Sequence, residues 1–266
     1  MHSHKVFPLL TGYFTVAFKN SGKFPKVENI PSFIFLIITE EGEPIIVDSS
    51  FDLNHIPAPD SKGVRSKEQE IVELLKGFNI APSDIGKVIQ THLHWDHAAN
   101  LSLFSKARIY VQLDEIKGLL NLRKYEETSF CPDHWFFMKD NFVLVDGDYE
   151  LLPGIELLKT GGHTAGHQAV KISCASGDVV LLGDSPFTYE WLWTLIPEDY
   201  WELYKKIADE SFFWIPKYSD KIKDWIFMAD IIQGSEKNHT VETLAKMSSR
   251  CIFSHATDLE PLKAIS

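Results

Sequence analysis

The chain of 266 residues has only three cysteines, Cys131, Cys174 and Cys251, which lie far apart in the sequence. An odd, widely spaced set does not form a disulfide framework, so it indicates a reducing compartment. The first twenty residues also lack the basic start, the unbroken apolar stretch and the small-residue cleavage site of a signal peptide. We therefore expect a cytoplasmic protein.

Positive charge, long apolar runs and glycine-rich loops are scarce as well. The formal net charge of -11 argues against a nucleic-acid backbone or an anionic membrane surface as a partner. No apolar run reaches the length of a membrane span, and no glycine-rich phosphate loop indicates a nucleotide cofactor. What is present is ordinary for a globular protein, with 44% hydrophobic and 24% charged residues.

Strand patterns dominate the chain. Two strands are predicted at 33–38 and 44–48, joined by a tight turn, and a helix is predicted to begin at Ser66, where Gln69 completes a capping box. A late helix is expected at 239–249. Further strands are predicted at 107–111, 142–145, 155–159, 169–173, 179–182 and 251–253. Without repeats or low-complexity linkers, residues 1–266 are predicted to form a single domain with helices outside the strands.

The densest chemical signal is the segment 91–97, with the sequence THLHWDH. It follows a short apolar run at 87–90 that predicts a buried strand, and alternation would point His92 and His94 to the same side. Asp96 and His97 follow, where we predict the first turn of a helix at 98–101. Imidazole and carboxylate together suit zinc, and also iron, cobalt or manganese. Four such ligands within six residues favour a metal site over a group of surface histidines.

Three more ligand-type residues, His163, Asp184 and His255, each directly follow a predicted strand. Active sites commonly gather at one set of strand ends, so these side chains can converge with the first motif. Taken alone, His163 or His255 would more often be a hydrogen-bonded structural residue. Combined, the five histidines and two aspartates fit two metals that share one bridging carboxylate.

The remaining histidines lack such a setting. His167 could hold a metal ligand in position without binding metal itself, although an ordinary structural role is favoured for it. Five of the remaining histidines are interpreted as surface or incidental: His2, His4, His55, His134 and His239.

The segments 91–97, 160–167, 182–184 and 254–255 resemble, in order and spacing, the successive metal motifs of the metallo-β-lactamase superfamily. Within it the chain looks most like the N-acyl-homoserine lactonase branch. The resemblance implies an α+β fold, the αββα four-layer sandwich, with metals in a cleft along one edge.

The resemblance also implies a ligand set. One metal would be held by His92, His94 and His163. The other would be held by Asp96, His97 and His255, and Asp184 would bridge. The cofactors would be two divalent metal ions, zinc first, with iron, manganese or cobalt as alternatives. Their shared hydroxide would open a lactone or related carboxylic ester, with Asp96 and Asp184 taking part in catalysis on an apolar or acylated small molecule.

The chain departs from the lactonase pattern at several positions. Ser49 and Ser50 follow Asp48 where relatives usually carry threonine and glycine, and Ala256 follows His255 where many have aspartate. Phe187 stands where homoserine lactonases usually carry a tyrosine that polarises the substrate carbonyl. Phenylalanine cannot donate a hydrogen bond. Tyr189, two residues further on, is therefore predicted to supply the donor, unless a metal alone polarises the substrate.

Aromatic residues are dense at about 187–230, with a smaller cluster at 135–137. This segment is predicted to be an insertion or lid that covers an acyl chain or ring. Core packing, or the interface of a homodimer, would use the same residues.

Three other functions stay open. A glyoxalase-II-like thioesterase is suggested by the segment 183–187, but the sequence offers no basic cluster for glutathione's carboxylates. A phosphotriesterase-like hydrolase could use the same metals. A catalytically silent binding protein on this fold would have no physical reason to keep seven ligands together.

Overall fold

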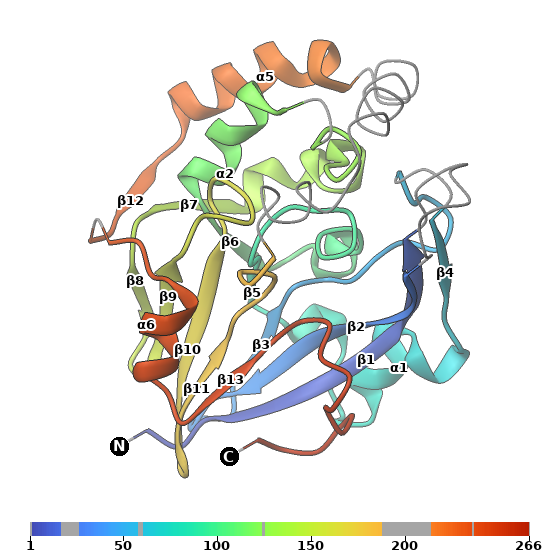
Figure 1. Ribbon diagram of the computed structural model, residues 1–266, viewed down its shortest axis with the longest axis vertical. Helices are drawn as coiled ribbons and strands as arrows, with labels where there is room; N and C mark the ends of the chain where they lie inside the picture. Colours follow the sequence, from blue (N-terminus) through green and yellow to red (C-terminus); the bar gives the residue numbers. More distant parts are fainter. Residues whose placement is uncertain are drawn as a thin grey trace.

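Figure 1 shows the computed structural model of the chain, in which two β-sheets are accompanied by helices. The structure describes residues 2–16, 27–57, 61–123, 126–187, 214–235 and 237–265.

Within these ranges the larger sheet has eight strands, in the order β12-β7-β6-β5-β3-β2-β1-β4. Their bounds are β1 (Lys5–Val16), β2 (Val27–Ile38), β3 (Pro44–Val47), β4 (Lys62–Val64), β5 (Lys87–Ile89), β6 (Arg108–Gln112), β7 (Phe142–Asp146) and β12 (Ile231–Gln233). Strands β3, β5, β6 and β7 pair parallel, so their carboxyl ends meet at one edge of the sheet.

The smaller sheet has five strands among the described residues, in the order β13-β11-β10-β9-β8. Their bounds are β8 (Tyr149–Leu152), β9 (Ile155–Lys159), β10 (Gln168–Cys174), β11 (Gly177–Leu181) and β13 (Arg250–Ile252). Because β9 and β11 both run antiparallel to β10, and β13 runs parallel to β11, the carboxyl ends of β9, β11 and β13 share one edge.

The helices are short, apart from α5. The α-helices are α1 (Ile71–Lys76), α2 (Leu113–Gly118), α5 (Trp214–Met228) and α6 (Val241–Lys246). The 3-10 helices are η1 (Lys67–Gln69), η2 (Pro82–Asp84), η3 (Leu101–Phe104), η4 (Leu119–Asn121), η5 (Pro132–His134) and η6 (Phe136–Asn141). None of these described helices is both long and apolar enough to cross a lipid bilayer.

Three hydrophobic cores define the layers. The core between the sheets joins Val47 of β3 to Leu181 of β11 and their neighbours. On the other face of the larger sheet, Ile116 of α2 and Ile222 of α5 belong to a second core. On the other face of the smaller sheet, Leu244 of α6 packs against β9, β10 and β11, and Figure 1 shows α6 beside these strands. The predicted αββα sandwich of the α+β class is therefore confirmed.

The predicted strands all form, with β9 matching its predicted range, but the long strand β1 and the short strands β4, β8 and β12 were missed. Pro8 and Gly12 interrupt the pattern of β1, and both usually weaken a strand. Pro8 is tolerated because β1 pairs with β4 only at residues 13–15, which leaves the second side of Pro8 outside the sheet ladder. The C-terminal segment covers this stretch instead, with the Leu262 N–H donating to the Pro8 carbonyl at 2.8 Å, a contact that needs no N–H from proline.

Two predicted helices differ from the structure. Ser66 begins only the turn η1, with its N–H donating to Gln69 Oε1 at 2.8 Å, because Glu70 is extended and separates η1 from α1. The predicted first helical turn at 98–101 was wrong: the chain turns there, and the 3-10 helix η3 follows. The late helix is confirmed as α6, where the Thr240 hydroxyl accepts from the Thr243 N–H.

The aromatic segment is only partly described. Tyr218 and Trp225 of α5 are buried, and Trp225 packs edge-on against Phe136 and Phe142, at 6.0 and 5.5 Å between ring centroids. In this part of the segment the core-packing alternative holds. The remainder of the predicted lid, with Tyr189, lies outside the described residues.

Candidate metal centre

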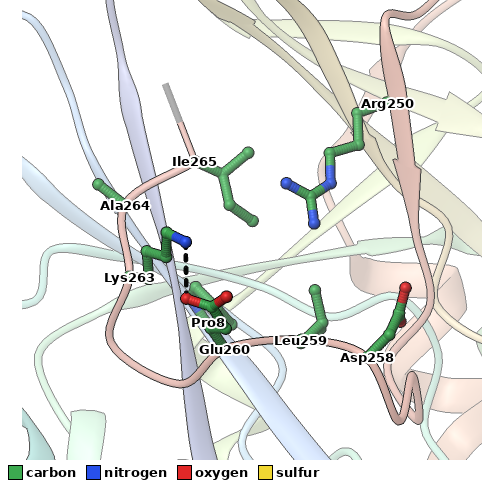
Figure 2. Close-up of a pocket in the computed structure, with 8 residues that line it drawn as sticks. All are labelled: Pro8, Arg250, Asp258, Leu259, Glu260, Lys263, Ala264 and Ile265. Atoms are coloured by element: carbon green, nitrogen blue, oxygen red, sulfur yellow. Dashed lines mark ion pairs between the residues drawn. The ribbon is translucent and has the colours of Figure 1, made fainter.

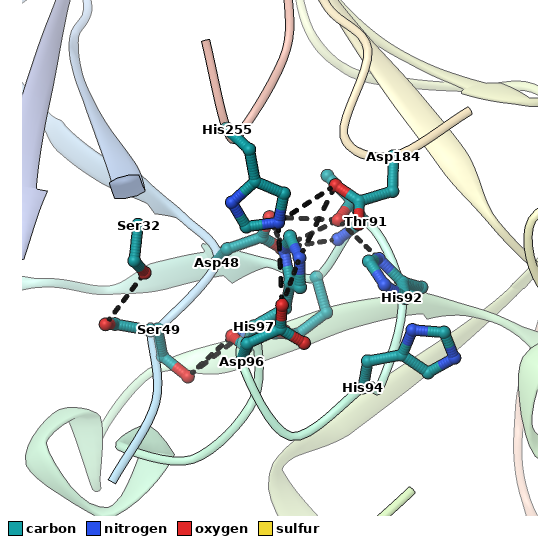
Figure 3. A network of polar contacts seen from close by, with 12 residues as sticks. Ser32, Asp48, Ser49, Thr91, His92, His94, Asp96, His97, Asp184 and His255 are labelled. Carbon is teal, nitrogen blue, oxygen red and sulfur yellow. Dashed lines mark hydrogen bonds and ion pairs between the residues drawn. The ribbon is translucent and has the colours of Figure 1, made fainter. Parts of the chain in front are cut away.

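The seven ligand-type side chains predicted from the sequence lie together where the two sheets meet at their carboxyl ends, and Figure 3 shows six of them. The larger sheet supplies the segment after β5. The smaller sheet supplies three residues, one after each of β9, β11 and β13: His163, Asp184 and His255. The N–H of Gln168 donates to the Thr91 carbonyl at 2.9 Å and joins the two sheets beside the site.

The segment 91–97 is shaped by backbone hydrogen bonds rather than by regular structure. The Trp95 N–H donates to the Ser129 carbonyl at 2.9 Å. The N–H groups of His97 and Ala98 both donate to the His94 carbonyl at 3.0 Å, which turns the chain back on itself. Asp96 and His97 are thereby brought beside the ligands that precede them.

One ligand group contains only imidazoles: His92, His94 and His163 (the three-histidine group). His94 Nδ1 lies 3.1 Å from His163 Nε2, and the His92 and His94 ring centroids are 4.4 Å apart. Nitrogens on one tetrahedral zinc ion, each about 2.0–2.1 Å from the metal, would be about 3.3 Å apart. The spacing fits a shared cation.

The second group contains carboxylates as well: Asp96, His97, Asp184 and His255 (the mixed group). Asp184 Oδ1 lies 3.5 Å from both His97 Nε2 and His255 Nε2. Its other oxygen, Oδ2, lies 3.6 Å from His163 Nε2 in the three-histidine group. Asp184 thus presents one oxygen to each group.

Three buried polar atoms at the centre make no hydrogen bond to any described residue: His92 Nε2, His97 Nε2 and Asp184 Oδ1. A buried polar atom without a partner costs roughly 1–3 kcal/mol. All three face the interior of the two groups, where a cation would satisfy them. The donor set therefore fits divalent metal.

In four of the ligand histidines, the ring nitrogen that points away from the site is held by a hydrogen bond. His97 Nδ1 donates to Asp48 Oδ2 at 2.9 Å, and His255 Nδ1 donates to the Pro31 carbonyl at 2.8 Å. His163 Nδ1 donates to the Phe187 carbonyl. Because these oxygens can only accept, the proton sits on Nδ1, and Nε2 keeps a lone pair directed at the site.

The Thr91 hydroxyl holds Nδ1 of His92, the nitrogen of that ring that points away from the site. It donates to Asp48 Oδ2 at 2.9 Å and so leaves its oxygen to accept from His92 Nδ1 at 3.0 Å. Asp48 therefore supports two ligands, one directly and one through Thr91.

Electrostatics differ between the two groups. Burial, with His97 as the next cause, lowers the pKa of His92 well below its usual value, and burial likewise lowers those of His94 and His163. In the mixed group burial is outweighed: Asp184, Asp96 and Asp48 hold the pKa of His97 well above its usual value, and Asp184 raises that of His255 to about 10. In turn His255 and His97 lower the pKa of Asp184, against its burial.

The sequence reasoning gave no role to Asp48 or Glu115. Buried Glu115 accepts from the N–H groups of Leu93 and Gly166, at 2.9 and 3.0 Å, and from the Thr164 hydroxyl. It therefore fixes both loops that carry the three-histidine group. The signal at Asp48 was an aspartate directly after a strand, the same setting as Asp184.

His167 has the hydrogen-bonded structural role that the sequence favoured, and one of its partners is the main chain of Asp184. Its Nδ1 lies 2.6 Å from the Thr160 hydroxyl, and its Nε2 accepts from the Asp184 N–H at 3.1 Å. Gly183 permits this approach, because a Cβ there would lie 2.6 Å from His167 Nε2 and its φ is +53°. The second histidine of the TGGHTAGH segment was the available signal.

Most of the histidines interpreted as surface or incidental have defined settings, and that interpretation was wrong for them. His4 and His134 are buried, and His239 Nε2 lies 2.7 Å from Asp148 Oδ2. His55 and His134 lie beside Cys131.

A surface pocket near the end of the chain is separate from this centre. Figure 2 shows it between Arg250 and the segment 258–265, with an ion pair between Glu260 and Lys263 at 2.6 Å. Arg250 begins β13, whereas His255 follows the other end of that strand. The pocket therefore does not open onto the ligand groups.

The sandwich and its two ligand groups define a protein built to hold divalent metal between two sheets. A sequence model of the Metallo-beta-lactamase superfamily matches residues 28–212. An N-acyl homoserine lactonase of Bacillus thuringiensis is 33% identical over 186 residues, 64% of this chain and 70% of that relative. Another, from Rhizobium radiobacter, is 26% identical over 196 residues, 63% of this chain and 66% of that relative.

Solved structures agree with the sequence relatives. A structure of an N-acyl homoserine lactone hydrolase, with the product N-hexanoyl-L-homoserine bound at its catalytic metal center, has a TM-score of 0.57 and 25% identity. The match covers 92% of this chain and 97% of that one. The chain belongs to the metallo-β-lactamase superfamily. It is a hydrolase of a class that depends on divalent metal ions.

Proposed function

We propose that the chain opens the lactone ring of N-acyl homoserine lactones at a centre of two divalent cations, zinc first. The observation that carries this proposal is the placement of Asp184, with Oδ1 facing the mixed group and Oδ2 facing the three-histidine group. The named activity of the relatives supports the lactone as substrate.

When bound, the two cations would acidify a shared water and polarise a carbonyl oxygen. The chain's own contribution is to hold the ligands in advance. Asp184 spans the two groups and sets their separation. Asp48, Pro31 and Phe187 each hold one histidine by an oxygen, so ligand orientation costs no rearrangement during turnover.

Asp96 is the other carboxylate in this scheme, and it is half-buried where Asp184 is buried. We propose that Asp96 accepts the proton released by the attacking water and then donates it to the departing alkoxide. The lactone and one water then yield one hydroxy acid, with no group left on the protein.

The donor to the substrate carbonyl is assigned to Tyr189 on its position in the sequence. Phe187 has no hydroxyl, its side chain is 38% exposed, and its main-chain carbonyl is engaged with His163. Tyr189→Phe should lower lactone turnover by about a hundredfold, the loss of one preorganised donor. Unchanged turnover would assign the polarisation to metal alone.

The proposed substrate is tested with a panel of homoserine lactones, thioesters and phosphotriesters, assayed on the zinc-reconstituted protein. The expected result is lactone turnover that a chelator abolishes and zinc restores. Faster turnover of a thioester or a phosphotriester would replace the lactone assignment. Turnover of no member would favour a binding protein on this fold.

A further inference from the structure

A second cluster of ligand-type side chains lies outside the centre described above and shares no residue with it: His55, Cys131 and His134. His55 is on the loop after β3, Cys131 immediately precedes η5, and His134 is the last residue of η5. Cys131 Sγ lies 3.8 Å from His55 Nε2, and the two imidazole centroids are 4.9 Å apart. One ligand atom from each residue lies within 4.8 Å of the others.

His134 is the residue that lacks an explanation without a ligand. It is 94% buried, and neither of its ring nitrogens makes a hydrogen bond to any described residue. Burying an imidazole in this way is costly, so such a group usually faces a partner. The weak contact between Cys131 and His55 does not involve His134, so both ring nitrogens of His134 stay unsatisfied. A cation between the three residues would satisfy one of them.

The chemistry of the three groups suits a metal. Burial, with His55 as the next cause, lowers the pKa of His134 to about 4, so the ring is neutral at neutral pH and keeps a lone pair. Burial raises the pKa of the Cys131 thiol to about 12. A bound cation would therefore displace the thiol proton to solvent and take the thiolate as its ligand.

We propose that His55, Cys131 and His134 form a second, independent metal site that takes a borderline-soft divalent cation, zinc first. One sulfur and two imidazole nitrogens are zinc ligands, and a sulfur and a nitrogen on one tetrahedral zinc are about 3.6 Å apart. The observed separation of 3.8 Å needs little adjustment. His55 is exposed, so the fourth position opens to water on its side.

The site would tie together two segments that are 76 residues apart in the sequence. Cys131 packs in one cluster with Trp95, and its neighbour Phe130 packs edge-on against His94 at 4.7 Å. A cation on Cys131 would therefore fix the segment that lies against the THLHWDH loop. The proposed role is structural, because the three ligands join two loops and share no residue with the ligand groups at the sheet edge.

Cobalt(II) substitution tests this site apart from the proposed lactonase activity. The catalytic ligand groups contain no cysteine, so thiolate-to-cobalt charge-transfer absorption can arise only at a cysteine site. The absorption should be present in the parent protein, lost in Cys131→Ser and weakened in His55→Ala. The matched control Cys251→Ser removes a half-buried thiol elsewhere and should keep the absorption.

Metal content provides the second measurement. After dialysis against a chelator whose zinc affinity lies between those of the intact and the weakened site, the parent protein should hold one equivalent more than His55→Ala, whatever number the other ligand groups hold. Zinc affinity at this site should fall at least about tenfold in His55→Ala, as for the loss of a supporting ligand contact. His55 is on the surface, so this variant decides the matter even if Cys131→Ser does not fold. Equal metal content in parent and variant, or charge transfer that persists in Cys131→Ser, would overturn the proposal.

Discussion

The two ligand groups of the proposed metal centre rest on different buried acids. Asp48 touches the mixed group itself, through His97 Nδ1 at 2.9 Å. Glu115 touches no ligand side chain in the three-histidine group and instead holds the loops around it, through Leu93, Thr164 and Gly166. One acid therefore acts on ligand charge and orientation, and the other acts on loop position.

This difference matches the protonation of the two groups. The carboxylates of the mixed group hold the pKa of His97 well above its usual value and raise that of His255 to about 10, so this group favours positive charge at its centre. The three-histidine group is kept neutral by burial. It can accept a cation without releasing protons. The same metal would therefore meet two electrostatic environments a few ångströms apart.

The largest effect on turnover is expected at Asp184, the residue that both groups share. Asp184→Ala should lower turnover of the best substrate by about a hundredfold or more, because it removes the carboxylate that faces both groups. Thermal unfolding of the variant should change far less. Asp178→Ala, on the same sheet but paired with Lys171, is the matched control. Near-normal turnover in Asp184→Ala would show that another residue joins the groups.

A substitution at Asp48 should lower zinc affinity in the two groups to different extents. Asp48→Asn keeps the shape but weakens the acceptor for His97, so zinc affinity of the mixed group should fall about 10- to 100-fold. The three-histidine group should change less, because Asp48 reaches it only through Thr91. Zinc titration monitored by competition with a chelator gives both affinities. Equal losses at the two groups would contradict the comparison.

Glu115→Gln should leave turnover within about tenfold of the parent but change the pH dependence of stability. Burial raises the pKa of Glu115 from 4.5 to about 7. The folded protein therefore binds this proton more tightly than the unfolded chain does, and stability is lost as pH rises from about 4.5 to about 7. The loss is roughly 3 kcal/mol at most.

Denaturant unfolding of parent and Glu115→Gln between pH 4 and pH 8 measures this contribution. The free energy of unfolding of the parent should fall with rising pH relative to that of the variant. Parallel curves would mean that Glu115 does not titrate in this range, and that its three hydrogen bonds already offset its burial.

The smallest effect is expected for Phe187→Tyr. The main-chain carbonyl that accepts from His163 is unchanged, so metal content should equal that of the parent. A new hydroxyl at this half-exposed position should raise lactone turnover by less than about tenfold. Steady-state kinetics on one homoserine lactone, with Tyr189→Phe assayed beside it, shows which residue donates. A loss of metal in Phe187→Tyr would contradict the assigned role of the main chain.

Local sequence was sufficient for the ligands but not for their supports. His92, His94, Asp96 and His97 are neighbours in one motif, and the other three each follow an apolar strand, so pattern alone found them. Asp48 acts on His97 from 49 residues away, and Glu115 acts on Gly166 from 51 residues away. The Asp48 contact forms only when β3 pairs with β5, and the Glu115 contact only when the two sheets pack, so local pattern could mark Asp48 as an aspartate after a strand but could not identify either partner.

Elements of the fold were likewise predicted where the signal is local and missed where it depends on distant contacts or on too few residues. Strands such as β9 and β11 were predicted because their own apolar residues indicate that they are buried. β1 was missed because the cost of Pro8 depends on which neighbouring strand is absent at that position. The short helix α2 was missed because six residues are too few to show helical periodicity.

Each ligand group draws on both sheets. His94 and His163 come from opposite sides of the seam, and so do Asp96 and His255. A cation held by either pair would make the parting of the sheets and the loss of the metal a single event. Heat inactivation would then follow the dissociation rate of the cation rather than the equilibrium stability of the chain. Shelf life would be set by how slowly the metal leaves.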